Sequence, residues 1–124
     1  RSFLMANPNV VAVSSISAKT VLDADVAASA VSLLTCASDK LCKINSLIIA
    51  NIDGTNSADI SVWITASSAD YYIAKGITVA AGSTLLPIDK NMGLYLVEGD
   101  ILKIQASAAG DLSAVLSYEE IDDA

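Results

Sequence analysis

Pairs of carboxylates are the first residues in this chain that could do chemistry. A glycoside hydrolase uses two acidic side chains at a fixed separation, one as an acid and the other as a base or nucleophile. Neighbouring acids of this kind occur at Asp23/Asp25, Asp53/Asp59, Glu98/Asp100, Glu119/Glu120 and Asp122/Asp123. Each pair falls in an expected turn or near the C-terminal end, and aspartate is common in turns because its carboxylate bonds to the backbone. The sequence therefore favours a turn-forming role for these acids over catalysis.

Other catalytic chemistries lack the residues that they need. The chain has no histidine, which excludes a histidine base, a histidine-based triad and a histidine metal ligand. A serine nucleophile would then need a lysine base, and no S-x-x-K motif is present. The G-x-S-x-G, G-x-G-x-x-G and phosphate-loop motifs are also missing from the sequence. We therefore expect a protein without enzymatic activity and without a cofactor.

One acidic run, residues 53–59, offers oxygen ligands of the kind that calcium prefers. It lacks the order of acidic residues and glycine that an EF-hand loop requires. We expect an Asx turn between two strands in its place, and we predict no metal site.

Cys36 and Cys42 are the two cysteines of the chain. If residues 37–41 form a hairpin loop, the two Cβ atoms could face each other across the strands, so a disulfide would be feasible. Two free buried thiols are the alternative, as expected for a protein made in a reducing cytosol. Two thiolates without further soft ligands do not make a zinc site, and there is no C-x-x-C redox motif.

The elements that must position these residues are β-strands, because apolar and polar residues alternate with period two. Ile60, Val62 and Ile64 alternate with polar neighbours, and the same period recurs in 102–107 and 112–119. We predict strands at 10–17, 19–22, 30–35, 42–51, 58–66, 71–79, 84–88, 94–97, 101–107 and 112–119, with a helical turn over 23–29 as an open alternative. With about eight main strands, an all-β, two-sheet antiparallel β-sandwich of the jelly-roll or Greek-key kind is expected.

The sequence fits one domain. We expect an extended N-terminal arm at 1–12, a single β-sandwich domain at 13–121 and an acidic C-terminal tail at 122–124. Pro8 favours the extended arm, because the residue before a proline avoids the helical region. Met5-Ala6 resembles a translation start, so residues 1–4 are expected to be an extension.

Aromatic residues are the best candidates for a binding surface. The alternation places Trp63 with Ser61 and Thr65, on the face of its strand opposite Ile60 and Val62. Trp63 could anchor a subunit contact or stack on a sugar, or an N-terminal strand or loop of the same chain could cover it. Tyr71 and Tyr72 should point to opposite faces of the next strand, one into the core and one outward. We predict an interface that includes Trp63, Tyr71, Tyr72, Phe3 and Leu4.

Composition points to contacts with protein. Hydrophobic residues make up 53% of the chain and charged residues 17%, with a net charge of −7. The negative charge opposes binding to nucleic acid and to anionic membranes, and no apolar run is long enough to span a bilayer. A small domain with this much apolar content and so little charge is expected to bury the surplus against other subunits. The open alternative is that its many alanines inflate the apolar share.

Several stretches together resemble a known group of proteins. They are residues 43–51, 53–62, 77–85, 94–108 and 115–121, including the turn Glu98-Gly99-Asp100 before a strand. Over residues 5–121 this pattern resembles the small β-sandwich virion structural proteins of tailed bacteriophages, notably those of cyanobacterial and marine phages. The resemblance implies a β-sandwich that acts as a symmetric oligomer on the particle and has no catalytic residues. The pair Cys36/Cys42 departs from the pattern expected of such relatives.

These observations lead to ranked functional hypotheses. We predict a non-enzymatic virion structural protein, a capsid decoration (cement) protein that stabilises the phage head as a homotrimer. Its partners would be copies of itself and the major capsid protein or other virion proteins, in a virion assembled in the host cytoplasm. The alternative is a tail, neck or fibre component with a receptor- or carbohydrate-binding sandwich, in which Trp63 and one of Tyr71 and Tyr72 stack on sugar. An enzyme that uses a carboxylate pair or calcium ranks last.

Overall fold

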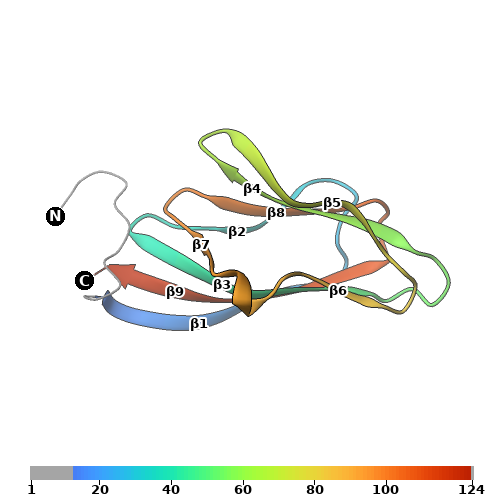
Figure 1. Ribbon diagram of the computed structural model, residues 1–124, viewed down its shortest axis with the longest axis horizontal. Helices are drawn as coiled ribbons and strands as arrows, with labels where there is room; N and C mark the ends of the chain where they lie inside the picture. Colours follow the sequence, from blue (N-terminus) through green and yellow to red (C-terminus); the bar gives the residue numbers. More distant parts are fainter. Residues whose placement is uncertain (1–12, 124) are drawn as a thin grey trace.

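Two antiparallel β-sheets pack face to face in the computed structural model, which describes residues 13–123 (Figure 1). Strands account for most of these residues, as expected from the period-two alternation. The elements are β1 (Val13–Asp23), β2 (Val31–Thr35), β3 (Lys40–Asn51), β4 (Ala58–Ala66), β5 (Ala69–Val79), β6 (Thr84–Ile88), the 3-10 turn η1 (Lys90–Met92), β7 (Leu94–Leu96), β8 (Ile101–Ala106) and β9 (Leu112–Asp123). None of the helical segments in this part of the chain is long and apolar enough to cross a membrane.

Strands from the two ends of the chain pair with each other, and the pairing then moves toward the middle of the chain. β1 pairs with β9, β2 with β8, β3 with both β6 and β7, and β4 with β5. Sheet A has the order β1-β9-β3-β6, with β7 also on β3, and sheet B has the order β2-β8-β4-β5. β6 and β7 pair with successive parts of β3, so they act as one edge strand interrupted by η1. The result is a long hairpin rolled into two four-strand layers, which is the jelly-roll form of the predicted sandwich.

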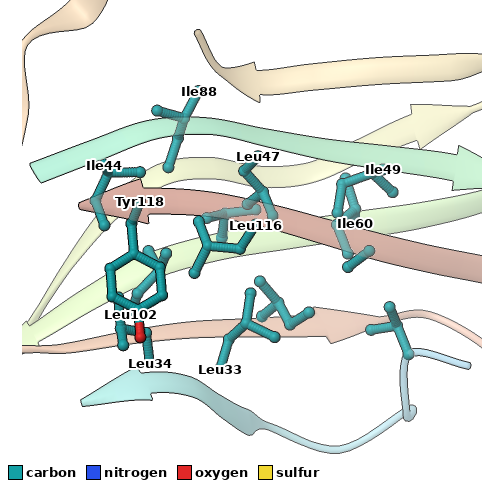
Figure 2. Packing of buried hydrophobic residues seen from close by; sticks show 14 of the residues in the cluster. Leu33, Leu34, Ile44, Leu47, Ile49, Ile60, Ile88, Leu102, Leu116 and Tyr118 are labelled. Carbon is teal, nitrogen blue, oxygen red and sulfur yellow. The ribbon is translucent and has the colours of Figure 1, made fainter. Parts of the chain in front are cut away.

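The core lies between the two sheets and is made of the residues that the alternation placed inward. Leu112, Ala114, Leu116 and Tyr118 of β9 are buried, as are the inward residues of β4 and β8. Figure 2 shows Leu116 and Tyr118 pointing across the sandwich toward Leu33 and Leu102 of sheet B. The predicted inner faces of these strands are confirmed.

The N-terminal strand differs from the prediction. Segments 10–17 and 19–22 were expected as separate strands, but β1 runs without a break from Val13 to Asp23. Ala18 pairs with Glu119 and Lys19 with Tyr118, so β9 holds β1 through the expected gap. No helix forms over 23–29, where the chain bends between sheets. The predicted N-terminal arm lies outside the described residues.

The C-terminal strand is longer than expected. β9 continues through Asp123, whereas the predicted strand ended at residue 119. The reason is pairing on both sides: Asp122 lies beside Ser15 of β1 and Lys40 of β3, and its carboxylate forms an ion pair with Lys40. That ion pair holds the pKa of Asp122 below its usual range.

Two aspartates that are far apart in the sequence meet at one end of the sandwich. Asp53 accepts hydrogen bonds from the backbone N–H groups of Thr55 (2.8 Å) and Asn56 (3.3 Å), which confirms the expected Asx turn. These bonds, led by that of Thr55, lower the pKa of Asp53, while the contact with the Asp53 carboxyl raises the pKa of Asp111. At neutral pH the two carboxylates therefore repel each other.

This contact predicts that Asp111→Asn raises the melting temperature at pH 7. Because the folded-state pKa of Asp111 is raised, protonated Asp111 contributes favourably to the stability of the fold at low pH. This contribution is lost as pH rises through the folded-state pKa. The asparagine amide can donate to Asp53 at every pH, so the gain should shrink toward about pH 4. Thermal melts between acidic and neutral pH measure this. Asp70→Asn, at an exposed site in β5, is the control for net charge, and an equal rise in both variants would contradict the prediction.

Candidate functional site

The carboxylates of the predicted pairs do not assemble into an acid–base site. The turn acids accept backbone N–H bonds: Asp23 from Asp25 (3.1 Å), Glu98 from Asp39 (2.7 Å) and Asp100 from Val97 (3.0 Å). Glu120 forms an ion pair with Lys19 at 2.9 Å, which links β9 to β1. Within residues 13–123, no three acidic or cysteine side chains gather in a way that could hold a metal ion. These acids therefore shape turns and join strands.

The two cysteines are both free and buried. Cys36 directly follows β2, and its thiol lies 3.3 Å from the carbonyl oxygen of Lys40 and 3.4 Å from that of Leu96. A hydrogen bond with the thiol of Cys42, together with burial, raises the pKa of Cys36. The expected proximity of the two side chains is therefore present, and the disulfide between them stays a prediction.

Trp63 lies on the outer face of sheet B, as the alternation predicted, but almost none of it is accessible. Its side chain is 5% exposed, although it is not part of the cluster between the sheets. Tyr72 of β5 and Lys103 of β8 flank it in register, and the rings of Trp63 and Tyr72 lie 5.3 Å apart. The neighbouring strand β5 contributes to this burial through Tyr72, whereas the sequence suggested an N-terminal strand or loop as the cover.

Tyr71 and Tyr72 are both exposed, so the prediction of one ring in the core is wrong. Tyr72 is 48% exposed on the outer face, and Tyr71 is 60% exposed although it pairs with Ile64, whose side chain packs against the core. β5 is an edge strand, and the β4–β5 hairpin tip extends away from sheet A, so nothing in the described chain covers the ring (Figure 1). An interface role for Trp63, Tyr71 and Tyr72 stays a prediction, and Phe3 and Leu4 lie outside the described residues.

The outer face of sheet A carries a second candidate surface. Register across β1, β9 and β3 aligns its outward side chains in rows, and we call this surface the sheet A face. Its members are Ile16, Ala18, Thr20 and Leu22 of β1, Val115, Ser117 and Glu119 of β9, and Lys43, Ser46 and Ile48 of β3. One row, Leu22–Val115–Ile48, is apolar, and the next, Thr20–Ser117–Ser46, presents hydroxyl groups.

The charges on the sheet A face balance. Only Lys43 and Glu119 are charged among its members, and they are cross-strand neighbours. Leu22 is 73% exposed, and Ile16 at the other end of β1 is exposed as well. This surface is therefore uncharged overall on a chain whose net charge is −7.

Comparisons with known proteins find this architecture in solved structures. No protein-family model and no curated protein matches the chain. Among solved structures, a protein of Bacillus endospore appendages, described as disulfide-linked pili, aligns with a TM-score of 0.51 and 17% identity, covering 89% of this chain and 90% of that one. A protein of T=1 particles derived from infectious bursal virus aligns with a TM-score of 0.52 and 11% identity, covering 90% of this chain and 32% of that one. A pentameric capsid protein from metagenomic phage sequences aligns at 0.38 and 15% identity over 83% of this chain and 60% of that one.

At these identities the comparisons establish the fold. The chain has the β-sandwich architecture found in a viral particle protein and in a pilus protein. It spans nearly the whole length of the pilus protein and about a third of the length of the bursal virus protein.

Sequence reasoning missed the sheet A face. The signal was present in the outward residues of β1 and β9, because Thr20, Leu22, Val115 and Ser117 lack charge where a solvated face usually carries it. The row of apolar residues could not be seen in the sequence, since Leu22 and Val115 become neighbours only when the first and last strands pair.

Proposed function

We propose that this protein is a non-enzymatic structural subunit of a virus particle that associates with copies of itself through the sheet A face. The observation that carries the proposal is the apolar row Leu22–Val115–Ile48 on the outer face of sheet A, in which Leu22 is exposed and Val115 and Ile48 are partly exposed. The carboxylates of the predicted pairs form contacts within turns and between strands, which supports a role without catalysis.

Charge favours a second copy as the occupant of this face. Two copies with a net charge of −7 repel each other, so they associate most easily through surfaces that are locally neutral. Lys43 and Glu119 balance each other there, and a second copy offers the same apolar row for contact. β1, which carries four members of this face, also lies at an edge of sheet A, and a long edge strand is prone to further pairing.

In its finer form, the proposal is a capsid decoration protein of a tailed bacteriophage, a homotrimer that stabilises the head by contacting the major capsid protein. The resemblance of residues 5–121 to small phage virion proteins supports this form, as does the small size of the domain. The alternative, a tail, neck or fibre component with a carbohydrate-binding face, is favoured by one observation, a hollow beside Tyr72 that is described in the next subsection.

Substitution of Leu22 by glutamate tests the self-association. Leu22→Glu places a charge in the apolar row without touching the core, and we expect at least about a tenfold weaker association. Ile52→Glu is the matched control, since Ile52 is 60% exposed in the β3–β4 loop and the same charge is introduced. Light scattering behind size-exclusion chromatography measures the mass of both variants and of the parent over a range of concentrations.

A monomeric parent protein, or equal loss of association in both variants, would contradict the proposal. The finer form is tested by sedimentation of the protein with phage heads that lack decoration. Binding to those heads supports a decoration protein, and an oligomer that ignores heads but binds tails supports the alternative.

A further inference from the structure

We propose that the outer face of sheet B binds a sugar unit of a glycan in the hollow beside Tyr72. The site lies on the sheet opposite the one that carries the proposed self-association, so it is a separate function. The hollow measures about 290 Å³ and is lined by Asp59 and Ser61 of β4, Tyr72 and Lys75 of β5, Gln105 of β8 and Ser107 just after β8. Its volume is close to the lower end of the range of ligand pockets, which suits one sugar ring.

The polar groups of the hollow are held in place before any ligand arrives. Asp59 accepts a hydrogen bond from Thr78 at 2.8 Å through one carboxylate oxygen, and its second oxygen can accept from a sugar hydroxyl. Gln105 donates to the carbonyl oxygen of Ala28 at 2.9 Å, which fixes its amide and directs the amide oxygen as an acceptor. Such fixed groups lose little rotamer freedom on binding.

The hydroxyl groups of the hollow are fixed in the same way. Ser61 accepts from the N–H of Gly76 at 3.0 Å and can still donate its own hydrogen. Gly76 has a φ of 61°, which is the left-handed region, and it lies where the β4–β5 register shifts. Ser107 accepts from the N–H of Asp59 at 2.8 Å. Donors and acceptors therefore line one hollow, as a ligand rich in hydroxyl groups requires.

Tyr72 supplies the apolar surface that a sugar ring also needs. The ring is supported from its own sheet by Trp63 at 5.3 Å, with 31° between the planes. The Lys75 ammonium lies 5.0 Å from the centre of the Tyr72 ring. The face of an aromatic ring attracts positively polarised groups. The C–H groups of a sugar carry the same polarity. A bound sugar would take the place of the exposed Lys75 ammonium over the ring, and that ammonium could then donate to a sugar oxygen.

Binding is tested first on an array of immobilised neutral and uronic-acid oligosaccharides, and then in solution with the sugar that binds. Trp63 is the single tryptophan and contacts Tyr72, so a change in its fluorescence reports on occupancy of the hollow. We expect Tyr72→Ala to lower the affinity at least about tenfold, and Gln105→Ala to lower it as well. Tyr95→Ala is the matched control, because Tyr95 is a half-exposed tyrosine of β7 in the other sheet.

Absence of binding to every sugar of the array, or equal loss in Tyr95→Ala and Tyr72→Ala, would overturn the site. If Tyr72→Ala does not fold by circular dichroism, Gln105→Ala carries the test. The self-association measured with Leu22→Glu should be unchanged in both hollow variants, so failure of the sugar site leaves the assembly proposal untouched.

Discussion

Trp63→Ala is expected to lower the free energy of unfolding by about 3 kcal/mol, the lower end of the range for a buried tryptophan. The side chain is 5% exposed, so its removal opens a space between Tyr72 and Lys103. The cost should be near the lower end because Tyr72 and Lys103 stand at the surface and can move into that space. If Trp63 were a solvent-facing binding anchor instead, its loss would change stability by no more than about 0.5 kcal/mol.

Urea unfolding followed by far-ultraviolet circular dichroism measures this difference without the tryptophan signal. Tyr71→Ala is the control, because this ring is exposed on the neighbouring strand and its removal should cost far less. A Trp63→Ala protein as stable as the parent would show that the cover over Trp63 contributes little, and would return the residue to the candidate contact surfaces.

Local alternation predicted the strands and their inner faces, because whether a side chain points in or out depends only on its neighbours in the sequence. β4 and β6 have the bounds that were expected, and Ile60, Val62, Leu116 and Tyr118 lie in the core. The order of strands in the sheets was not predictable in the same way. β1 pairs with β9 across almost the whole chain, and no local pattern encodes such a partner. For this reason the sequence allowed both a jelly roll and another Greek-key sandwich.

The same limit explains what sequence reasoning missed at the candidate sites. It paired Asp53 with Asp59, which is near in sequence, whereas the fold brings Asp53 to Asp111 and places Asp59 in the hollow. Gln105 meets Ser61 only because β8 lies beside β4 in sheet B. One of Tyr71 and Tyr72 was expected in the core because alternation gives the direction of a side chain but not where the opposite sheet ends. Contacts between distant strands built both candidate surfaces.

Asn51→Leu is expected to destabilise the protein by about 2–4 kcal/mol, since it removes one buried and two partly buried hydrogen bonds. Asn51 is 4% exposed at the end of β3 and is the buried polar residue of the described chain. Its amide donates to the carbonyl oxygens of Val79 (2.9 Å) and Asn56 (3.0 Å), and its own oxygen accepts from the N–H of Asp53 (2.8 Å). These bonds tie the β3–β4 loop to the end of β5.

The exposed site Asn91→Leu is the control, where the same change should stay within about 0.5 kcal/mol in urea unfolding. Asn51→Asp separates hydrogen bonding from shape, because it keeps the size and the acceptor but removes both donors. Its carboxylate would face two carbonyl oxygens in a buried site, which raises its pKa, so the penalty should grow as pH rises through that value. A loss in Asn51→Leu that Asn51→Asp does not share at any pH would mean that packing, and not donation to Val79 and Asn56, holds the loop.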